Sequence, residues 1–207
     1  VFASDLRPRI SMRLVRELEA RLRRVCPGYA PRNARELLDW VVERVAIPVD
    51  QWRELLGAVE RDTGLAPATL LAELAGKVVA VAVGGGAAPA LVAASESLER
   101  IAAAAERPLS LSSALLDGGT VGAQAPVVPA ASESGEGDPL ADLLAEVLRF
   151  SGPVPAVGLF EALLGVAPER AADALSQLVD AQRVVVGELI ADEPGPEVCD
   201  SDNFERL

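Results

Sequence analysis

Apolar residues recur every three or four positions in several stretches of this chain, and β-branched residues form unbroken runs elsewhere. The first periodic stretch begins after Pro8. It ends at Cys26-Pro27-Gly28, because proline and glycine both oppose continuation of a helix. Its apolar stripe comprises Ile10, Leu14, Leu18, Leu22 and Val25. This spacing predicts an N-terminal amphipathic helix that buries one face.

Residues 33–107 predict three helices, two strands and a further helix. The helices are expected at 34–44, 51–62 and 68–75, with Asp50 as the cap of the second. The β-branched run at 78–83 predicts a buried strand, and 90–94 can return as its partner after the turn at Gly84-Gly85-Gly86. Ser95 is expected to cap a last helix that reaches Ala105. The order of helix, helix, helix, strand, loop and strand is typical of a winged-helix module.

The last part of the chain repeats this order after a break. Residues 108–137 lose periodicity and gather Pro, Gly, Ser and Ala, which predicts a flexible linker. Asp138 can cap a new helix, followed by a second helix at 157–164. Gly165-Val166-Ala167-Pro168 mirrors Gly64-Leu65-Ala66-Pro67, and each proline suits the first turn of a third helix. Strands are then expected at 184–190 and 197–199.

The predicted fold class is mainly α with small β-hairpins (α+β). It contains two winged-helix-like modules, at 33–107 and 138–200, joined by the linker at 108–137. A basic amphipathic helix and its connector precede them in 1–32, and another helix starts at 201–207. This interpretation depends on the repeated pattern alone.

Charge is distributed unevenly along the 207 residues. The formal net charge is −12, yet residues 1–35 hold nine Arg against three acidic residues, and residues 138–207 hold four Arg against fourteen Asp or Glu. Such asymmetry suggests that the N-terminal end meets a polyanion or an acidic partner. The chain starts at Val1 without a visible signal peptide and ends on what looks like the first turns of a helix. We therefore expect an internal piece of a longer, cytoplasmic protein.

Composition excludes several chemistries. The chain has no His and only two Cys, Cys26 and Cys199. A Cys/His zinc site, a Ser-His-Asp triad and a disulfide framework therefore cannot be assembled. The Gly84-Gly85-Gly86 turn matches no nucleotide-binding motif, and no phosphate-binding loop occurs. The seventeen uncharged residues at 78–94 are interrupted by Gly and Pro, which favours a buried hairpin over a membrane span.

Two further features have both a functional and a structural interpretation. Trp40 and Trp52 could stack on bases, but their helical positions favour the core. An acidic cluster could bind a cation or supply an acid/base pair, but it lacks the EF-hand spacing and a solvated loop is favoured. The cluster comprises Asp192, Glu193, Glu197, Asp200 and Asp202.

The basic N-terminal helix is the candidate for nucleic-acid binding, because phosphate binding needs clustered cations on one face. A docked helix with Arg at its solvent edge explains the same pattern equally well. The third helix of the second module offers only Arg170 against Glu169, Asp173 and Asp180, so we expect scaffold or protein interface there. The candidate DNA-binding residues are Arg13, Arg16, Arg21, Arg23, Arg24, Arg32 and Arg35. Charge reversal at Arg21, Arg23 and Arg24 is expected to weaken DNA binding.

Two stretches resemble the C-terminal region of the large helicase-related (Lhr) family of superfamily 2 DNA helicases. The first is Pro27-Gly28-Tyr29-Ala30-Pro31-Arg32-Asn33-Ala34-Arg35-Glu36-Leu37-Leu38-Asp39-Trp40, continuing to Trp52. The second is Val186-Gly187-Glu188-Leu189, followed by Glu197-Val198-Cys199-Asp200 and Asn203-Phe204-Glu205-Arg206-Leu207. These motifs are structural rather than catalytic.

The resemblance implies an ATP-dependent, 3′-to-5′ DNA-translocating helicase of bacterial DNA repair, whose motor, with its ATP and Mg²⁺, lies outside this stretch. The family's C-terminal regions also resemble winged-helix DNA glycosylases with a Gln-x-Gln or Gln-x-Asp motif. None of the four glutamines here fits that motif, so no catalytic residue is carried over. We expect a non-motor accessory region with no cofactor of its own, whose partners are DNA and other domains of the same chain, and no membrane. The alternative is an acidic protein-interaction or oligomerisation scaffold, such as a homo-oligomer, which the net charge and the stripe at 10–25 favour.

Overall fold

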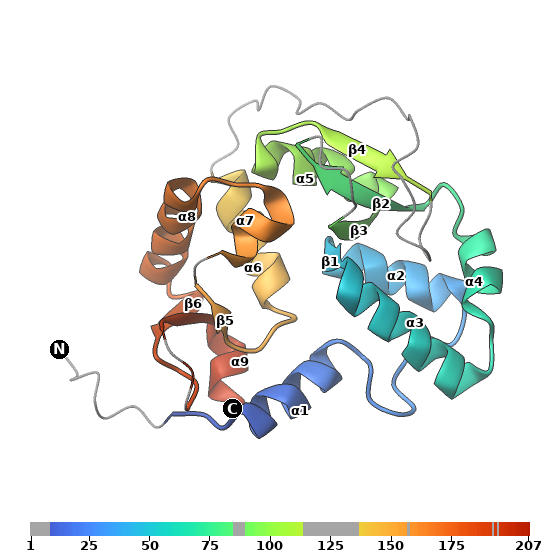
Figure 1. The fold of residues 1–207 in the computed structure, drawn as a ribbon, viewed down its shortest axis with the longest axis horizontal. Coiled ribbons are helices and arrows are strands. Elements are labelled where there is room, and N and C mark those ends of the chain that lie inside the picture. Colours follow the sequence, from blue (N-terminus) through green and yellow to red (C-terminus); the bar gives the residue numbers. More distant parts are fainter. Residues whose placement is uncertain (1–8, 85–89, 114–136, 157, 192, 194) are drawn as a thin grey trace.

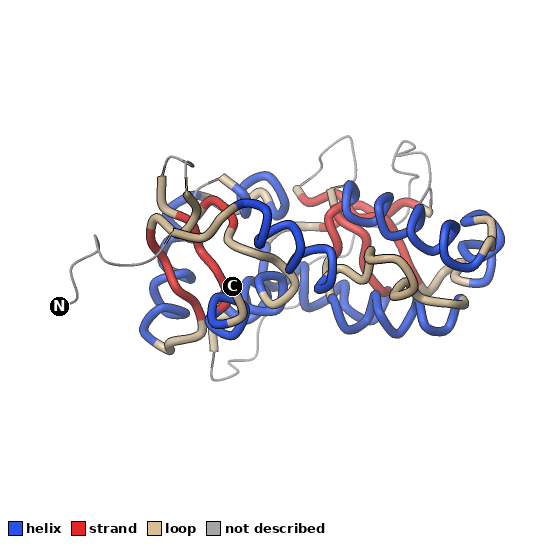
Figure 2. The backbone as a smooth tube through the Cα atoms, turned by 90° about the horizontal axis from the view of Figure 1, so that it is seen from below, coloured by secondary structure: helices blue, strands red, loops and turns tan. Residues whose placement is uncertain are grey.

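The computed structural model describes residues 9–84, 90–113, 137–156, 158–191, 193 and 195–207. These residues form a mixed α/β fold with two small antiparallel sheets (Figure 1). The N-terminal amphipathic helix, α1, spans Met12–Leu22. It lies near the C-terminus of the chain and between two larger blocks of structure (Figures 1 and 2).

The first block contains the helices and strands of residues 33–112. Pro67 stands at the first turn of its helix α4, where the missing backbone N–H of proline costs no hydrogen bond. The elements are α2 (Ala34–Arg44), β1 (Ile47–Pro48), α3 (Val49–Thr63), α4 (Pro67–Glu73), β2 (Val78–Val83), β3 (Leu91–Ala94), the 3₁₀ turn Ser95–Ser97, α5 (Leu98–Ala105) and β4 (Leu109–Ser112).

The second block contains residues 137–205. Asp138 caps its first helix by accepting a hydrogen bond from the Leu140 backbone N–H at 3.0 Å. The elements are α6 (Pro139–Leu148), β5 (Val154–Pro155), α7 (Leu159–Leu164), α8 (Pro168–Asp180), β6 (Val184–Gly187), β7 (Glu197–Asp200) and α9 (Ser201–Glu205). The strand orders are β1-β3-β2-β4 in the first sheet and β5-β7-β6 in the second. The order of helix, strand, helix, helix, strand and strand therefore occurs in both blocks.

Three local predictions were wrong. The first residues of the predicted linker form a strand: β4 pairs antiparallel with β2, with Leu109 opposite Val83. Ser95 does not cap α5, because its hydroxyl donates to the Gly76 carbonyl. Asp50 lies within the first turn of α3 rather than at its cap, since that helix begins at Val49. The rest of the predicted linker, 114–136, lies outside the described residues.

Both faces of the first sheet are buried, which explains the uncharged run in the sequence. Val78 and Ala80 pack against α2, α3 and α4, whereas Val79 and Val81 belong to a second core with α5. Successive residues of a strand point to opposite faces, so a strand buried on both sides has no position for a charge. The pairing of β2 with β3 confirms the hairpin that the sequence predicted. Within the described residues, no helix combines the length and apolar character needed to cross a membrane.

The two blocks pack on each other. Residues of β2, β3 and α5 share one hydrophobic core with α6, α7 and α8. Ile101 of α5 and Leu143 and Leu144 of α6 are fully buried in it. The sequence had predicted two modules connected only by a linker; the α5–α6 contact shows that the connection is also a packed interface.

Candidate nucleic-acid interface

The N-terminal end of α1 is anchored to the second block. The Ile10 backbone donates to the Leu189 carbonyl at 2.8 Å, and the Ala191 backbone donates to the Ile10 carbonyl at 2.9 Å. Ile10, Val15 and Ile190 form a small core, with Phe204 packed against it. The predicted apolar stripe is therefore covered in part: Ile10 is buried, and Leu18, Leu22 and Val25 are half-buried. Leu14 of the stripe stays 39% exposed, and Val15, which the stripe did not include, is buried in its place.

The C-terminal end of α1 is fastened to the first block. Arg24 lies over the ring of Trp40, 4.1 Å from the ring centroid, and pairs with Glu43 at 3.7 Å. Asp62 accepts hydrogen bonds from the Gly28 and Ala30 backbones. A hydrogen bond from Arg61, together with these backbone donors, holds the pKa of Asp62 below its ordinary value.

The solvent-facing side of α1 carries the cations that remain accessible. Arg13, Arg16 and Arg21 line one shallow hollow of about 420 Å³. Arg13 has a loose contact with Glu17, at 3.8 Å on the helix surface. In the part of the chain that the structure describes, neither Arg16 nor Arg21 forms an ion pair. These guanidinium groups are free to meet an anion in solvent.

The other four candidate residues divide into two pairs. Arg32 and Arg35 are exposed, just before and within the first turn of α2, where Asn33 caps the helix. Arg23 is half-buried and bound to Glu19 at 2.7 Å. Arg24 is half-buried against Trp40. Arg24 therefore docks α1 on the first block, whereas Arg23 is held by a residue of α1 itself. Each interpretation of the basic helix thus applies to different residues of it.

Both tryptophans lie in the core, as their helical spacing indicated. Trp52 is fully buried, and Trp40 is 4% exposed. The Trp40 ring meets Phe150 edge-on, with 5.3 Å between the ring centroids. Neither ring is accessible to a nucleic-acid base.

Arg44 is a buried cation beside this aromatic pair. Its side chain is 2% exposed and lies over the Phe150 ring, 4.9 Å from the centroid. It donates to the Gln51 side-chain oxygen at 2.8 Å. Burial lowers the pKa of Arg44 to about 9, and the nearby Arg23 adds to this effect. Its role is structural, because it does not reach solvent.

The third helix of the second block presents carboxylates to solvent. Its one cation, Arg170, makes two hydrogen bonds to Asp138, both of 2.6 Å. This pairing holds the pKa of Asp138 below its ordinary value. Glu169, Asp173 and Asp180 are exposed. Phosphates would be repelled by this helix surface.

Two of the acidic residues near the end of the chain have structural roles. Glu197 is buried and accepts a 2.7 Å hydrogen bond from the Leu189 backbone, so it is not in a solvated loop. Asp200 caps α9 through the Asn203 backbone N–H. Asp192 lies outside the described residues. Among the described ones, no group of three potential ligands could hold a metal ion.

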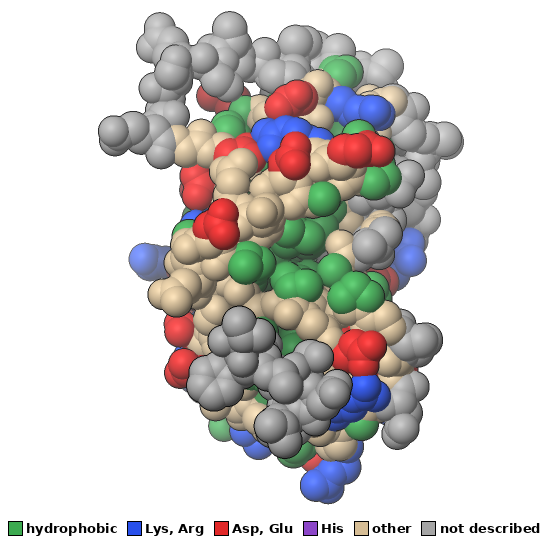
Figure 3. Space-filling model, turned by 90° about the vertical axis from the view of Figure 1, so that its left-hand side faces the viewer, with side chains coloured by type: hydrophobic (Ala, Val, Ile, Leu, Met, Phe, Trp, Pro, Cys, Tyr) green, Lys and Arg blue, Asp and Glu red, His purple; other side chains and the backbone are tan. Residues whose placement is uncertain are grey.

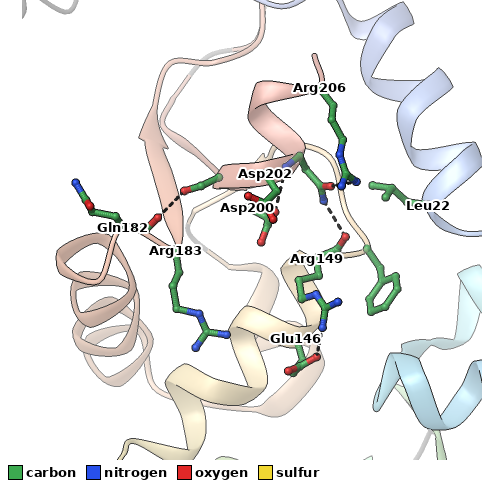
Figure 4. A pocket seen from close by; sticks show the side chains of 11 residues that line it. Leu22, Glu146, Arg149, Gln182, Arg183, Asp200, Asp202 and Arg206 are labelled. Carbon is green, nitrogen blue, oxygen red and sulfur yellow. Dashed lines mark hydrogen bonds and ion pairs between the residues drawn. The ribbon is translucent and has the colours of Figure 1, made fainter.

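A polar pocket of about 580 Å³ lies beside these residues (Figure 4). Arg149, Arg183 and Arg206 line it together with Glu146, Asp200 and Asp202, so opposite charges are mixed in its wall. Asn203 is buried at its base, with its amide donating to the carbonyls of Leu148, Arg149 and Ser151. Ser201 donates to the Gln182 carbonyl at 2.9 Å rather than to a base. The Asn203 hydrogen bonds therefore tie α9 to the end of α6. The residues that line the pocket do not pair a nucleophile with a base, as covalent catalysis needs.

Comparisons with known proteins identify no family. No protein-family model matches the chain, and no curated protein matches it.

Proposed function

We propose that this chain is a non-motor accessory region of an ATP-dependent DNA helicase of DNA repair, and that it positions DNA by backbone contact. ATP and Mg²⁺ belong to a motor outside this stretch, and the chain's own contribution is binding and domain packing. The resemblance of its sequence motifs to the large helicase-related family supports this proposal. The basic surface of α1 supports it independently.

A winged-helix architecture for both blocks is part of this proposal. The blocks share the order helix, strand, helix, helix, strand and strand, with the first strand at one edge and the last strand in the middle of three. This shared arrangement supports a winged-helix architecture for the two blocks. In the first block, β4 extends the three strands by a fourth.

The observation that carries the proposal is the combination of anchored ends and free cations on α1. Both ends of this helix are fastened to the body of the protein, whereas Arg13, Arg16 and Arg21 face solvent together. A rigid helix that presents clustered cations binds phosphates without ordering a loop. In many DNA-binding modules the third helix reads the groove. The third helices here are α4 and α8, and within the described residues they carry no free cation. Contact with the phosphate backbone is therefore favoured over base reading.

The test is DNA binding by the 207-residue chain across a series of salt concentrations. Reversal at Arg23 would break its ion pair with Glu19, and reversal at Arg24 would disturb docking of α1, so the informative variant is Arg16→Glu with Arg21→Glu. Each phosphate contact adds about 0.9 to the slope of log affinity against log salt. The variant is expected to bind more weakly and to flatten this slope by about 2. Fluorescence anisotropy with a labelled duplex measures both quantities.

The matched control reverses two exposed cations elsewhere, Arg53→Glu with Lys77→Glu, for the same change in net charge. It is expected to keep the wild-type slope. Unchanged affinity in the α1 variant would contradict the proposal. An equal loss in both variants would also contradict it, since that result reflects total charge rather than a site.

The second candidate function is an acidic interaction scaffold that binds no nucleic acid. The exposed carboxylates of α8 favour it. The apolar stripe of α1 gives oligomerisation little support, because Leu14 is its one exposed residue and the chain itself covers the others in whole or in part. Sedimentation at several protein concentrations, alongside the DNA titration, discriminates the two functions.

A further inference from the structure

The second block carries an apolar groove on a surface separate from the α1 cations. The groove has a volume of about 590 Å³. Its wall is formed by α8 on one side and by Phe160 of α7 and Val186 of β6 on the other. Figure 3 views the side of the molecule where these elements lie, and hydrophobic side chains gather near its centre.

The wall of this groove is more apolar than an ordinary protein surface. Phe160 and Leu175 lie at its floor, and Val179 and Val186 stay 42% and 39% exposed. Both are among the exposed large hydrophobic residues of the described chain, and they line the same hollow. Contiguous apolar surface of this kind marks binding sites.

One border of the groove is acidic. Glu169, Asp173 and Asp180 stand at positions i, i+4 and i+11 of α8, so they follow one edge of the helix. That edge adjoins Ala172, Ser176 and Val179 of the wall. Arg170, the cation of the same helix, points to Asp138 and leaves this border negative.

We propose that this groove binds an amphipathic helix of a partner protein, with apolar residues at i, i+3, i+4 and i+7 and Lys or Arg along its flank. Helix-in-groove binding uses apolar anchors at this spacing. The acidic border selects basic flanks, because complementary charge sets partner choice and orientation. The basic helix of a second copy of this chain does not fit the role, since Leu14 is the one exposed residue of its apolar stripe and a helix in this groove needs several anchors.

The probes are two labelled helical peptides of about 18 residues, long enough to form a helix. Both have Leu at i, i+3, i+4 and i+7; one has Lys along the flank and the other has Glu. Fluorescence anisotropy with the full chain is expected to show saturable binding of the Lys peptide and at least about tenfold weaker binding of the Glu peptide. Absence of saturable binding by the Lys peptide would overturn the proposal.

The groove variant is Val179→Gln with Val186→Thr, which changes exposed side chains and keeps residues suited to a helix and a strand. It is expected to lower the affinity for the Lys peptide roughly tenfold, because anchor contacts dominate such interfaces. Leu65→Gln is the matched control, since Leu65 is 38% exposed and lies outside the groove. Equal binding by the groove variant would overturn the site, and circular dichroism checks that all variants are folded.

Charge-reversal variants distinguish peptide selection by the acidic border of the groove from a general attraction of the Lys peptide to an acidic protein. Asp173→Lys with Asp180→Lys is expected to shift preference toward the Glu peptide. Glu54→Lys with Glu60→Lys, on α3, makes the same change in net charge and is expected to keep preference for the Lys peptide. If both variants lost the preference for the Lys peptide, the acidic border would not be the cause of that preference. A dimer that dissociates when Val179 and Val186 are changed would identify a second copy as occupant and overturn the partner helix.

Discussion

The guanidinium of Arg24 lies 4.1 Å from the centroid of the Trp40 ring. Arg24 follows the end of α1, with a left-handed backbone φ of 57°, and Trp40 belongs to α2. Together with the Arg24–Glu43 ion pair, this contact fastens the basic helix to the first block. It also covers a face of the indole that could otherwise have met a base.

Arg24→Ala is expected to lower the free energy of unfolding by about 1 kcal/mol, through loss of the cation–π contact and of the packing of its alkyl chain. Arg21→Ala removes a cation of the same helix that is exposed to solvent. It is expected to change stability by less than about 0.5 kcal/mol. Urea denaturation of the two variants measures the difference. Equal effects would show that the Arg24 contact is not what holds the helix.

Asp138→Ala is expected to cost about 2 kcal/mol, because Asp138 both caps α6 and binds Arg170. Its folded pKa lies below its ordinary value. The pairing therefore contributes full stability above about pH 4 and loses it as pH falls through the folded pKa. The variant is expected to show a flatter acid limb in denaturation measured against pH. Asp142→Ala is the control, since Asp142 forms an exposed pair with Arg183.

Asn203→Ala is expected to cost about 2–3 kcal/mol, because three carbonyls lose their shared donor. Asn203→Asp should be worse at neutral pH, where an ionised carboxylate cannot donate. Its stability relative to wild type is expected to improve as acid protonates that carboxyl group. Thermal unfolding at pH 7 and near pH 4 would test this direction, and a pH-independent deficit would contradict it.

The two cysteines should differ in reactivity. Cys199 is fully buried, and burial raises the pKa of its thiol to about 12. Because the thiolate is the reactive form, Cys199 is expected to react with a disulfide reagent only after unfolding. Half-buried Cys26 is expected to react in the native protein. Cys26→Ser should remove the native reaction, and residual rapid labelling in that variant would argue against burial of Cys199.

Local rules were sufficient for most of the helices and strands. Pro67 and Pro168 start α4 and α8 because proline has no N–H to leave unpaired in a first turn. The strand β4 was missed, although Leu109 and Leu111 alternate with serine in the period of a strand. Its surroundings are rich in Ser and Gly, and the pairing partner of β4 lies far earlier in the chain.

Tertiary contacts explain what sequence could not provide about the candidate interface. The spacing predicted an apolar face on α1 that includes Leu14, whereas the structure buries Val15 against the second block and leaves Leu14 exposed. The sequence spacing of Arg21, Arg23 and Arg24 does not show which of them faces solvent and which are bound within the fold. Arg23 and Arg24 are held by Glu19, Glu43 and Trp40, and the last two lie on another helix. The groove beside α8 was equally invisible, because it brings together elements separated along the chain.

The core shared by α5 and α6 makes the repeated blocks energetically inseparable. Ile101 and Leu143 are buried within the same core, so unfolding one block exposes apolar surface of the other. The chain should therefore melt in a single cooperative transition, as one foldon rather than as two. Each repeat depends on its neighbour for part of its own stability.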